Sequence, residues 1–289
     1  MALALLLWAL IEPLCLTLRH SYFSQKNGSP RGSVYPGKAG ETICLNRPAG
    51  SLRLALISDL HSSFCQISPD RLSRLIAQAS VDGVVFAGDI STWHWDRLKG
   101  LSWLKKLSGL LKDKGLILYA VPGNHDQGLT AAKLAAYGPV PLYNRSAVLR
   151  DRSDRNWLLV GLEDLITGQP DLQQALLHID GQKSIAAATI PAARTIVLAH
   201  NPDTVYRLTG TEAHWILSGH FHGGQIRLPG RLEFKTLRSE GLPQEGIYQH
   251  HYHKNGLAGY ITNGLGCVLL PFRFLAPPEL AILDFLIES

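Results

Sequence analysis

The arrangement of apolar runs in the first half of the chain is the feature that most constrains its fold. A strand-like run, a polar loop and a helical pattern follow one another three times over, with the runs at Leu52–Ile57, Val84–Ala87 and Leu116–Val121. The first helical pattern begins at the capping residue Ser68, and the second covers 96–112 with leucines at three- and four-residue spacings. This alternation predicts parallel strands with functional loops at their carboxyl ends.

The second half of the chain carries more signals for antiparallel strands. Residues 146–150 and 157–161 flank a polar segment and predict a hairpin, and two later runs are joined across Asn255-Gly256. We therefore expect two packed sheets with helices on their outer faces. The other elements expected here are a helix over 171–179, a helix that starts at Asn201 and Pro202, and strands at 195–199, 225–228, 247–253, 258–262 and 280–285.

The first 11 residues, Met1–Ile11, are almost wholly apolar, and Glu12-Pro13 ends the run. A spanning helix needs ~20 apolar residues, so this run is short for crossing a bilayer, and it lacks the basic region and cleavage site of a secretory signal. It fits a shallow membrane-associated helix, the remnant of a longer anchor, or a helix docked on the domain; Trp8 favours the first. Alternation predicts a strand over 14–22, and composition predicts a loop over 27–40.

Charge and cysteine content narrow the functional classes. The net charge is +5 and the pI is near 9.0, but the basic residues form no block of five or more. This suits mild attraction to an acidic membrane surface or a phosphorylated substrate, and we expect no nucleic-acid partner. The four cysteines are widely separated, which indicates neither a disulfide framework nor a Cys-x-x-Cys zinc site.

Every polar loop that follows an apolar run carries side chains that can bind metals. In the turn Ser218–Gln225, one residue separates His220 from His222, and the two histidines could bind two different ions. A His-x-His pair alone is weak evidence for a metal site. Carboxylate, imidazole and amide groups at one sheet edge suit a pair of divalent ions such as Mn²⁺, Fe²⁺ or Zn²⁺, and a set without cysteine argues against structural zinc. The candidate residues are Asp59 and His61, Asp89, Asn124 with His125, His200, and His220 with His222.

In this order, these motifs resemble the ordered motif set of the calcineurin-like metallophosphoesterases, from about Arg53 to the end of the chain. Residues 219–229 and 263–279 are similar to the YkuE-type bacterial branch, in which a hydrophobic segment commonly precedes an Ile-Glu-Pro like that at 11–13. The resemblance implies an α/β fold, a four-layer α/β/β/α sandwich of two mixed sheets with a dinuclear metal site at the strand ends. The implied activity is hydrolysis of a phosphoester or pyrophosphate bond.

The resemblance also implies a role for each candidate residue. Two ions about 3.5 to 4 Å apart would bind phosphate oxygens and activate a bridging water, so the protein supplies no covalent nucleophile. His125 would contact the phosphate or protonate the leaving oxygen. The implied ligands are Asp59, His61 and His222 for the first metal, Asn124, His200 and His220 for the second, and Asp89 as the bridge between them.

One departure from the family pattern affects His125. Many relatives carry an aspartate three residues after the bridging aspartate, where it orients the equivalent histidine, and this chain has Thr92 there. The acid role of His125 then depends on Asp96 or Asp126 replacing the missing carboxylate. The Asp-Arg-Gly of protein phosphatases is also absent after Gly88-Asp89, which disfavours a phosphoprotein substrate.

Two other clusters have competing interpretations. The tract His250–His253 lies on an expected strand, where alternate residues face opposite sides, and this favours an exposed or substrate-edge strand over a third metal site. Trp93, Trp95 and Trp103, with nearby leucines and lysines, could form a lip for a lipid. A helix packed on the sheet with its lysines in water is the preferred interpretation.

Together, these observations predict a membrane-associated segment over 1–18 and a metallophosphoesterase domain over 19–289. We expect two divalent ions, with Mn²⁺ favoured and Fe²⁺ or Zn²⁺ as options. The expected substrate is a phosphorylated amphiphile at the cytoplasmic face of a bacterial inner membrane, and within the family this points to UDP-2,3-diacylglucosamine. The alternatives are a general phosphodiesterase of other nucleotides or phospholipids, and a non-catalytic metal-binding scaffold.

Overall fold

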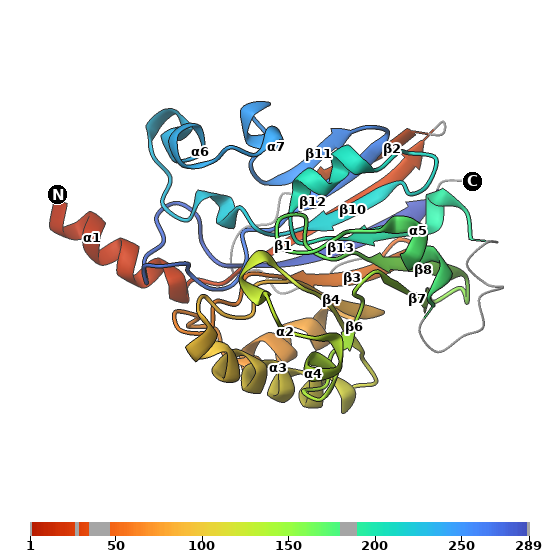
Figure 1. The fold of residues 1–289 in the computed structure, drawn as a ribbon, viewed down its shortest axis with the longest axis horizontal. Helices are drawn as coiled ribbons and strands as arrows, with labels where there is room; N and C mark the ends of the chain where they lie inside the picture. Colours follow the sequence, from red (N-terminus) through yellow and green to blue (C-terminus); the bar gives the residue numbers. More distant parts are fainter. Residues whose placement is uncertain (1, 27–28, 35–46, 180–189, 288–289) are drawn as a thin grey trace.

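The computed structural model of the protein describes residues 2–26, 29–34, 47–179 and 190–287. Within these ranges, seven strands form a mixed sheet in the order β2-β1-β13-β3-β4-β5-β6 (Figure 1). Strands β3 to β6 are parallel, β13 is antiparallel to β3 and parallel to β1, and β2 is antiparallel to β1. Their bounds are β1 (Thr17–Lys26), β2 (Ser29–Val34), β3 (Leu52–Ile57), β4 (Gly83–Ala87), β5 (Leu118–Val121), β6 (Val140–Pro141) and β13 (Glu279–Ile287).

The second sheet contains six strands of the described chain, in the order β11-β12-β10-β9-β8-β7. Its inner strands β12, β10, β9 and β8 are parallel, whereas β7 and β11 are antiparallel edges. Two packed sheets were expected, and within the second sheet antiparallel pairing is confined to two hairpins. The bounds are β7 (Arg145–Arg150), β8 (Asn156–Gly161), β9 (Thr195–Leu198), β10 (Trp215–Ser218), β11 (His250–Lys254) and β12 (Leu257–Ile261).

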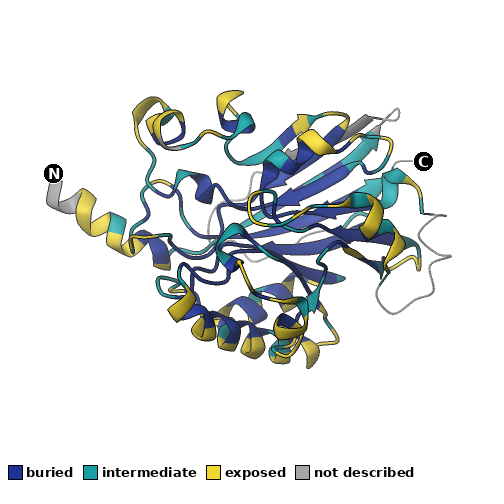
Figure 2. Ribbon diagram, in the orientation of Figure 1, coloured by how far each residue is buried: buried dark blue, intermediate teal, exposed yellow. Residues whose placement is uncertain are grey.

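The two sheets pack against each other, and helices cover their outer faces, which gives the expected four-layer α/β/β/α arrangement (Figure 1). The alternation of side chains along β3 shows how the layers form. Leu54 and Leu56 lie in the cluster between the sheets, whereas Ala55 and Ile57 pack against the helices on the other face. Figure 2 shows the strands buried and the outer sides of the helices exposed.

Helices α2 and α3 cover the outer face of the first sheet. Ser68 caps α2 by accepting a hydrogen bond from the backbone N–H of Arg71, as its sequence position predicts. The buried leucines of α3 recur at three- and four-residue spacings. The α-helices of the body are α2 (Pro69–Ala79), α3 (Arg97–Lys112), α4 (Ala131–Ala135), α5 (Leu172–Leu177), α6 (Leu232–Leu237) and α7 (Gly241–Gln244).

Short 3-10 helices complete the connections between the main elements. The helix expected from Asn201 is one of these, and it runs over Pro202–Arg207 with the Asn201 side chain as its cap. The 3-10 helices of the described residues are η1 (Glu12–Leu14), η2 (His94–Asp96), η3 (Asn124–Asp126), η5 (Ala192–Arg194), η6 (Pro202–Arg207), η7 (His222–Gly224) and η8 (Pro229–Arg231).

At the N-terminus, helix α1 (Ala2–Ile11) projects from the body of the molecule (Figure 1). Its large apolar side chains from Leu5 onward are exposed, so it is not docked along the domain surface, and that interpretation was wrong. Among the described residues, the structure contains no helix with the length and apolar character to traverse a bilayer.

Two further expectations, a loop over 27–40 and a strand over 225–228, were also wrong. The loop expected over 27–40 contains strand β2, and its residues 27–28 and 35–40 lie outside the described part. The pairing of Lys26 with Ser29 leaves a two-residue connection of sequence Asn-Gly, a strong hairpin signal that composition alone obscured. The strand expected over 225–228 does not form, because Gly224 and Gln225 adopt positive φ and turn the chain.

Candidate metal centre

All eight candidate residues lie at the carboxyl ends of five parallel strands, drawn from both sheets. Their loops follow β3, β4 and β5 in the first sheet and β9 and β10 in the second. Because the sheets are packed face to face, these strand ends meet at one edge of the sandwich. We call seven of them the strand-end cluster: Asp59, His61, Asp89, Asn124, His200, His220 and His222.

One half of the strand-end cluster contains Asp59, His61, Asp89 and His222, all buried. Each offers one ligand atom, and these atoms all lie within 4.8 Å of one another. His222 Nε2 is 3.2 Å from Asp59 Oδ1 and 3.1 Å from His61 Nε2. Two imidazoles and two carboxylates with converging ligand atoms could hold a divalent ion.

The other half is built around His200. Its Nε2 atom lies 3.1 Å from Asn124 Oδ1, 3.2 Å from His220 Nδ1 and 3.3 Å from Asp89 Oδ2. The same Asp89 oxygen lies 3.4 Å from Nε2 of His61 in the first half. Asp89 therefore stands between the two halves of the cluster.

The hydrogen bonds around His200 indicate that the cluster fits a cation. Its Nδ1 lies 2.6 Å from the carbonyl oxygen of Ala87, and a carbonyl only accepts, so Nδ1 carries a proton. In the neutral imidazole, Nε2 then presents a lone pair toward the oxygens of Asn124 and Asp89, which are acceptors as well. Converging lone pairs in a buried site are stabilised by a positive charge between them.

The electrostatics of the buried groups lead to the same conclusion. Burial alone lowers the pKa of His200, but the Asp89 carboxylate outweighs it and raises the pKa to about 10. Burial alone raises the pKa of Asp89, yet His200 and His61 hold it well below its usual range. Burial lowers the pKa of His222 to about 4. In the metal-free protein the centre therefore attracts positive charge and keeps Asp89 ionised and His222 neutral, whereas His200 holds a proton that a metal ion would displace.

The backbone at the cluster is strained in a consistent way. Asp59, His61, Asp89, His220 and His222 all have positive φ, between 37° and 72°. Left-handed conformations of residues other than glycine cost of order 1 to 3 kcal/mol each and concentrate at functional sites. Gly88 precedes one of them at φ 84°, and a Cβ there would lie 2.6 Å from the backbone nitrogen of Gly123. Close packing of the strand-end loops thus requires glycine at this position.

His125 lies at the edge of the cluster, and its ring is supported differently from expectation. Its Nδ1 lies 3.0 Å from the backbone oxygen of Thr92, which accepts the hydrogen bond. Asp126 instead accepts hydrogen bonds from the backbone N–H groups of Asp89, Ile90 and Gly123. Its side chain holds two strand-end loops together and does not replace the carboxylate expected beside His125.

Asp96 is also occupied elsewhere. Its carboxylate accepts hydrogen bonds from the backbone N–H of Trp93 at 3.0 Å and from the hydroxyl of Ser63 at 2.7 Å. Neither Asp96 nor Asp126 replaces the missing carboxylate beside His125, so that expectation was wrong. The backbone carbonyl of Thr92 lies beside the ring of His125 instead.

Thr92 supports two imidazoles. Besides the carbonyl that contacts His125, its hydroxyl contacts Nδ1 of His61 at 3.0 Å.

Two charged residues beside His220 were not predicted from the sequence. The Nε2 atom of His220 lies 3.0 Å from Glu240 Oε1 and 3.1 Å from Nη1 of Arg238, and its Nδ1 atom faces the cluster. Arg238 donates one hydrogen bond to Glu240 at 3.0 Å and another to the backbone oxygen of His220 at 3.0 Å. Both residues lie between α6 and α7, far from any strand end, and no motif marks them.

The histidine tract is not part of the centre. His250 pairs with Glu279 at 3.1 Å, and the ring of His251 packs on Phe23 with centroids 4.8 Å apart. Among the described residues, no group of three or more histidine, cysteine or carboxylate side chains with converging ligand atoms includes the tract, so nothing there supports a third metal.

The tryptophan segment contains a packed part and an exposed part. Trp103 donates to the backbone oxygen of Ile67 at 3.0 Å, and the neighbouring leucines of α3 are buried, as expected for a helix packed on the sheet. Trp95 is exposed and stacks on Trp93 with ring centroids 5.2 Å apart.

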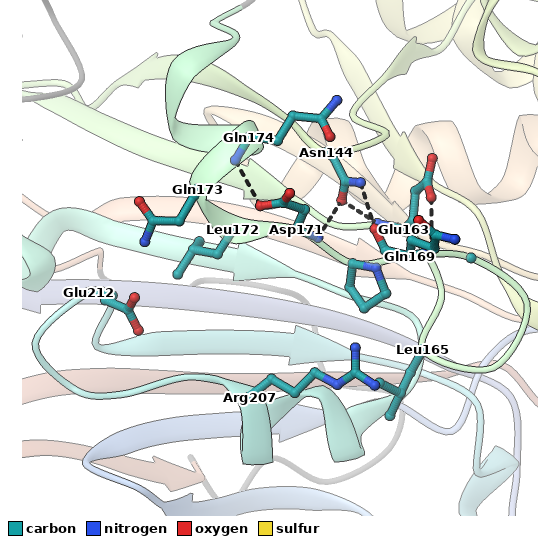
Figure 3. Close-up of a pocket in the computed structure, with 12 residues that line it drawn as sticks. Asn144, Glu163, Leu165, Gln169, Asp171, Leu172, Gln173, Gln174, Arg207 and Glu212 are labelled. Carbon is teal, nitrogen blue, oxygen red and sulfur yellow. Dashed lines mark hydrogen bonds between the residues drawn. The ribbon is translucent and has the colours of Figure 1, made fainter.

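A polar pocket of about 750 Å³ lies on the side of the molecule formed by 163–174 (Figure 3). Figure 3 shows Asn144 at its wall, where its side-chain oxygen accepts from the backbone N–H groups of Glu163 and Asp171. Three carboxylates and one guanidinium line this pocket, so it does not suit a phosphate. The charged lining residues are Glu163, Asp171, Arg207 and Glu212.

The fold and the strand-end cluster together define a class, the metal-dependent hydrolases built on an α/β/β/α sandwich. Residues 52–224 match the model of the calcineurin-like phosphoesterase family, and the chain belongs to that family. It is therefore a hydrolase acting on phosphoester bonds. Members of the family typically use a dinuclear site of divalent metal ions.

Three relatives show how far the similarity extends. The chain is 29% identical over 216 residues to the metallophosphoesterase YkuE of Bacillus subtilis, covering 72% of this chain and 68% of that one. It is 28% identical over 299 residues to the UDP-2,3-diacylglucosamine pyrophosphatase LpxG of Chlamydia muridarum, covering 82% and 84%. It is 32% identical over 118 residues to the phosphodiesterase YaeI of Escherichia coli, covering 38% of each chain. The resemblance to the YkuE-type branch is confirmed.

Proposed function

We propose that the strand-end cluster is a dinuclear centre that activates water for phosphoester or pyrophosphate hydrolysis. The observation that carries this proposal is the position of Asp89 Oδ2, 3.4 Å from Nε2 of His61 and 3.3 Å from Nε2 of His200. A carboxylate between two groups of imidazoles suits a bridging ligand. The first ion would take Asp59, His61 and His222, the second Asn124, His200 and His220, and Asp89 would serve both.

The protein contributes positioning and charge. When bound, two divalent ions supply a water of lowered pKa and neutralise the phosphate oxygens. Asp59 and Asp89 balance the ionic charge, and the buried loops exclude bulk water from the ligands. We expect Mn²⁺ at the centre, with Fe²⁺ or Zn²⁺ as the other ions that this mixed oxygen and nitrogen donor set suits.

We assign His125 a contact with the phosphate or the leaving oxygen. Its backbone N–H donates to Asp89 Oδ1 at 2.9 Å, and its ring lies 5.1 Å from the ring of His61. Because Nδ1 donates to the carbonyl of Thr92, Nε2 is the atom available to substrate. An imidazolium at that position could protonate the departing oxygen.

For the substrate, we propose a phosphorylated amphiphile such as UDP-2,3-diacylglucosamine. Support comes from the activity in the name of the Chlamydia muridarum relative, the net charge of +5 and the exposed apolar helix α1. We further propose that residues 1–18 associate with the membrane, at its cytoplasmic face, and that 19–289 form the catalytic domain, with no nucleic-acid partner.

The substrate is tested directly by incubating the purified protein and Mn²⁺ with UDP-2,3-diacylglucosamine. We expect the lipid monophosphate and UMP as products, detected by mass spectrometry. Hydrolysis of bis-p-nitrophenyl phosphate without any turnover of the lipid would favour a general phosphodiesterase and would exclude the lipid substrate.

The Asp89→Asn substitution tests the centre itself. Loss of the bridging carboxylate should weaken metal binding and hydrolysis of bis-p-nitrophenyl phosphate by at least about 100-fold, beyond the 10- to 100-fold cost of removing a group that only supports a ligand. Metal content is measured by elemental analysis, with Asp113→Asn on the surface as the control. A variant that keeps both metals and activity would contradict the assignment. A wild-type protein that binds metal but hydrolyses no phosphoester would support a scaffold.

A further inference from the structure

Helix α1 is apolar on every side that the structure describes. The large side chains from Leu5 to Ile11 are each between 46% and 55% exposed, and none of them is polar. Successive helical positions are about 100° apart, so these side chains surround the helix axis. A protein groove covers one stripe of a helix, whereas a helix that is apolar all round needs an apolar surrounding on every side. This favours lipid over a partner protein.

The helix is fixed to the body by a buried carboxylate. Glu12 is only 2% exposed, and it accepts hydrogen bonds from the backbone N–H groups of Leu275 at 2.9 Å and Ala276 at 2.6 Å. The backbone N–H of Arg273 also donates to the carbonyl of Ala9 at 3.1 Å. These bonds set the position of α1 relative to the loop that contains residues 268–276, which we call the leucine loop.

That loop carries exposed leucines of its own. Leu269, Leu270 and Leu275 are between 51% and 62% exposed. Leu269 and Leu275 have φ of 61° and 57°, a conformation that costs free energy for a residue other than glycine. Burial in the protein does not offset this cost, because both side chains point to solvent.

A second exposed pair lies on the adjoining segment. Leu228 and Leu232 are exposed, and this segment is joined to the leucine loop by hydrogen bonds between the backbones of Arg227 and Phe274 at 3.0 Å and of Phe274 and Gln225 at 2.8 Å. In Figure 1, α1 and α6 extend toward the same side of the molecule. Lys235 is exposed on this segment, and a basic residue beside apolar ones suits an anionic lipid surface.

The leucine loop is also bonded to the strand-end cluster. The backbone N–H of Gly266 donates to the carbonyl of Asp59 at 2.7 Å, and the guanidinium of Arg273 donates to the carbonyl of His222 at 3.4 Å. Any surface that binds the leucine loop therefore keeps the strand-end cluster at a fixed distance from that surface.

From these contacts we propose that α1, the leucine loop and Leu228 with Leu232 form one docking face for an anionic phospholipid bilayer. The face would place the strand-end cluster beside the headgroups, so that the centre acts on a phosphorylated amphiphile without extracting it from the membrane. This part of the inference rests on the proposed function, whereas docking itself does not.

Vesicle flotation tests the docking face. Wild-type protein in EDTA is mixed with vesicles of phosphatidylcholine alone or with about 30% phosphatidylglycerol, and we expect tighter binding to the anionic vesicles. The variant Leu269→Ser, Leu270→Ser, Leu275→Ser keeps α1 intact and should bind about 10- to 100-fold more weakly, because each leucine loses apolar burial in lipid. The matched control carries Ile117→Ser, Ile166→Ser and Leu177→Ser, three exposed apolar residues outside the face.

Equal flotation of the loop variant and wild type would overturn the docking face, as would an equal loss in the control. Thermal unfolding of each variant shows that the comparison is between folded proteins. Hydrolysis of soluble bis-p-nitrophenyl phosphate by wild type with Mn²⁺ reports the proposed function separately. Flotation without hydrolysis would leave the docking face standing and remove the function, and hydrolysis without flotation would do the reverse.

Discussion

Thr92 holds two imidazoles of the centre in different ways. Its hydroxyl lies 3.0 Å from Nδ1 of His61, and its carbonyl accepts from Nδ1 of His125 at the same distance. The family pattern has an aspartate at this position, so the sequence suggested that the ring of His125 lacks the carboxylate that would orient it. A carbonyl orients His125 as a carboxylate would, but without its negative charge it stabilises the imidazolium less.

The substitution Thr92→Val isolates the hydroxyl from the carbonyl. Valine keeps the shape of the side chain and the backbone bond to His125, but it leaves the Nδ1–H of His61 without an acceptor inside a buried site. Groups that support metal ligands are typically worth 10- to 100-fold in affinity, so we expect Mn²⁺ binding to weaken by about that factor. Calorimetric titration measures it. Thr130→Val, at the cap of α4, is the control and should leave the metal affinity unchanged; an equal affinity for Thr92→Val would contradict the role.

At the scale of elements, the sequence predicted which candidate side chains come together because of one topological rule. Parallel strands end at one edge, so Asp59, Asp89 and Asn124 could be placed together without knowing any distance. Glu240 and Arg238 could not be found in this way. They lie after α6, and their contact with His220 depends on how the irregular chain beyond residue 224 folds back, which no hydrophobic period encodes.

Among the strands too, some could be predicted from a local pattern in the sequence and others could not. The expected runs at 52–57 and 84–87 became β3 and β4, because buried strands are continuous apolar runs. The parallel pairing of β8, β9 and β10 was hidden, because the described parts of their connections contain only the short helices α5, η5 and η6, whereas the hairpins have short, recognisable turns. Long-range pairing was therefore the part that local pattern could not supply.

Glu240, in the segment that joins α6 and α7, is predicted to position His220 for metal binding. Glu240 Oε1 accepts from Nε2 of His220, which leaves Nδ1 as the lone pair that faces the cluster. Glu240→Ala removes this acceptor and should weaken Mn²⁺ binding by about 10- to 100-fold, and Glu240→Gln, which keeps an oxygen, should fall between that variant and wild type. Glu245→Gln, directly after α7 and paired with Lys254, is the control. Wild-type affinity in the alanine variant would show that Glu240 does not position His220.

At the scale of the whole molecule, a buried charged group links three strands of the first sheet. Asp284 on β13 accepts two hydrogen bonds from Arg53 on β3, at 2.7 and 2.8 Å, and lies 2.7 Å from Nε2 of His20 on β1. Both Arg53 and Asp284 are buried. Breaking such a pair costs more than breaking a surface pair, because the remaining charge stays in a medium of low dielectric constant.

This group makes the stability of the fold depend on pH in a defined direction. Burial alone raises the pKa of Asp284, but hydrogen bonds from His20 and Arg53 outweigh it and hold the pKa below its ordinary value of 3.8. As the pH falls through 3.8, the unfolded chain binds a proton at Asp284 before the folded chain does, so the stabilisation present above that pH is progressively lost. Asp284→Asn should cost about 3 to 5 kcal/mol at pH 7, and the difference from wild type should narrow below about pH 4.

Urea unfolding in EDTA at several pH values between 7 and 3 measures this difference. The strand-end carboxylates titrate in both proteins and largely cancel in the comparison, which leaves the contribution of Asp284. Asp154→Asn breaks an exposed pair with Arg150 and should change the stability little at any pH. A gap between Asp284→Asn and wild type that stays constant down to pH 3 would mean that Arg53 and His20 do not depress the pKa of Asp284. A narrowing gap would identify this buried group as one source of acid sensitivity in the whole sandwich.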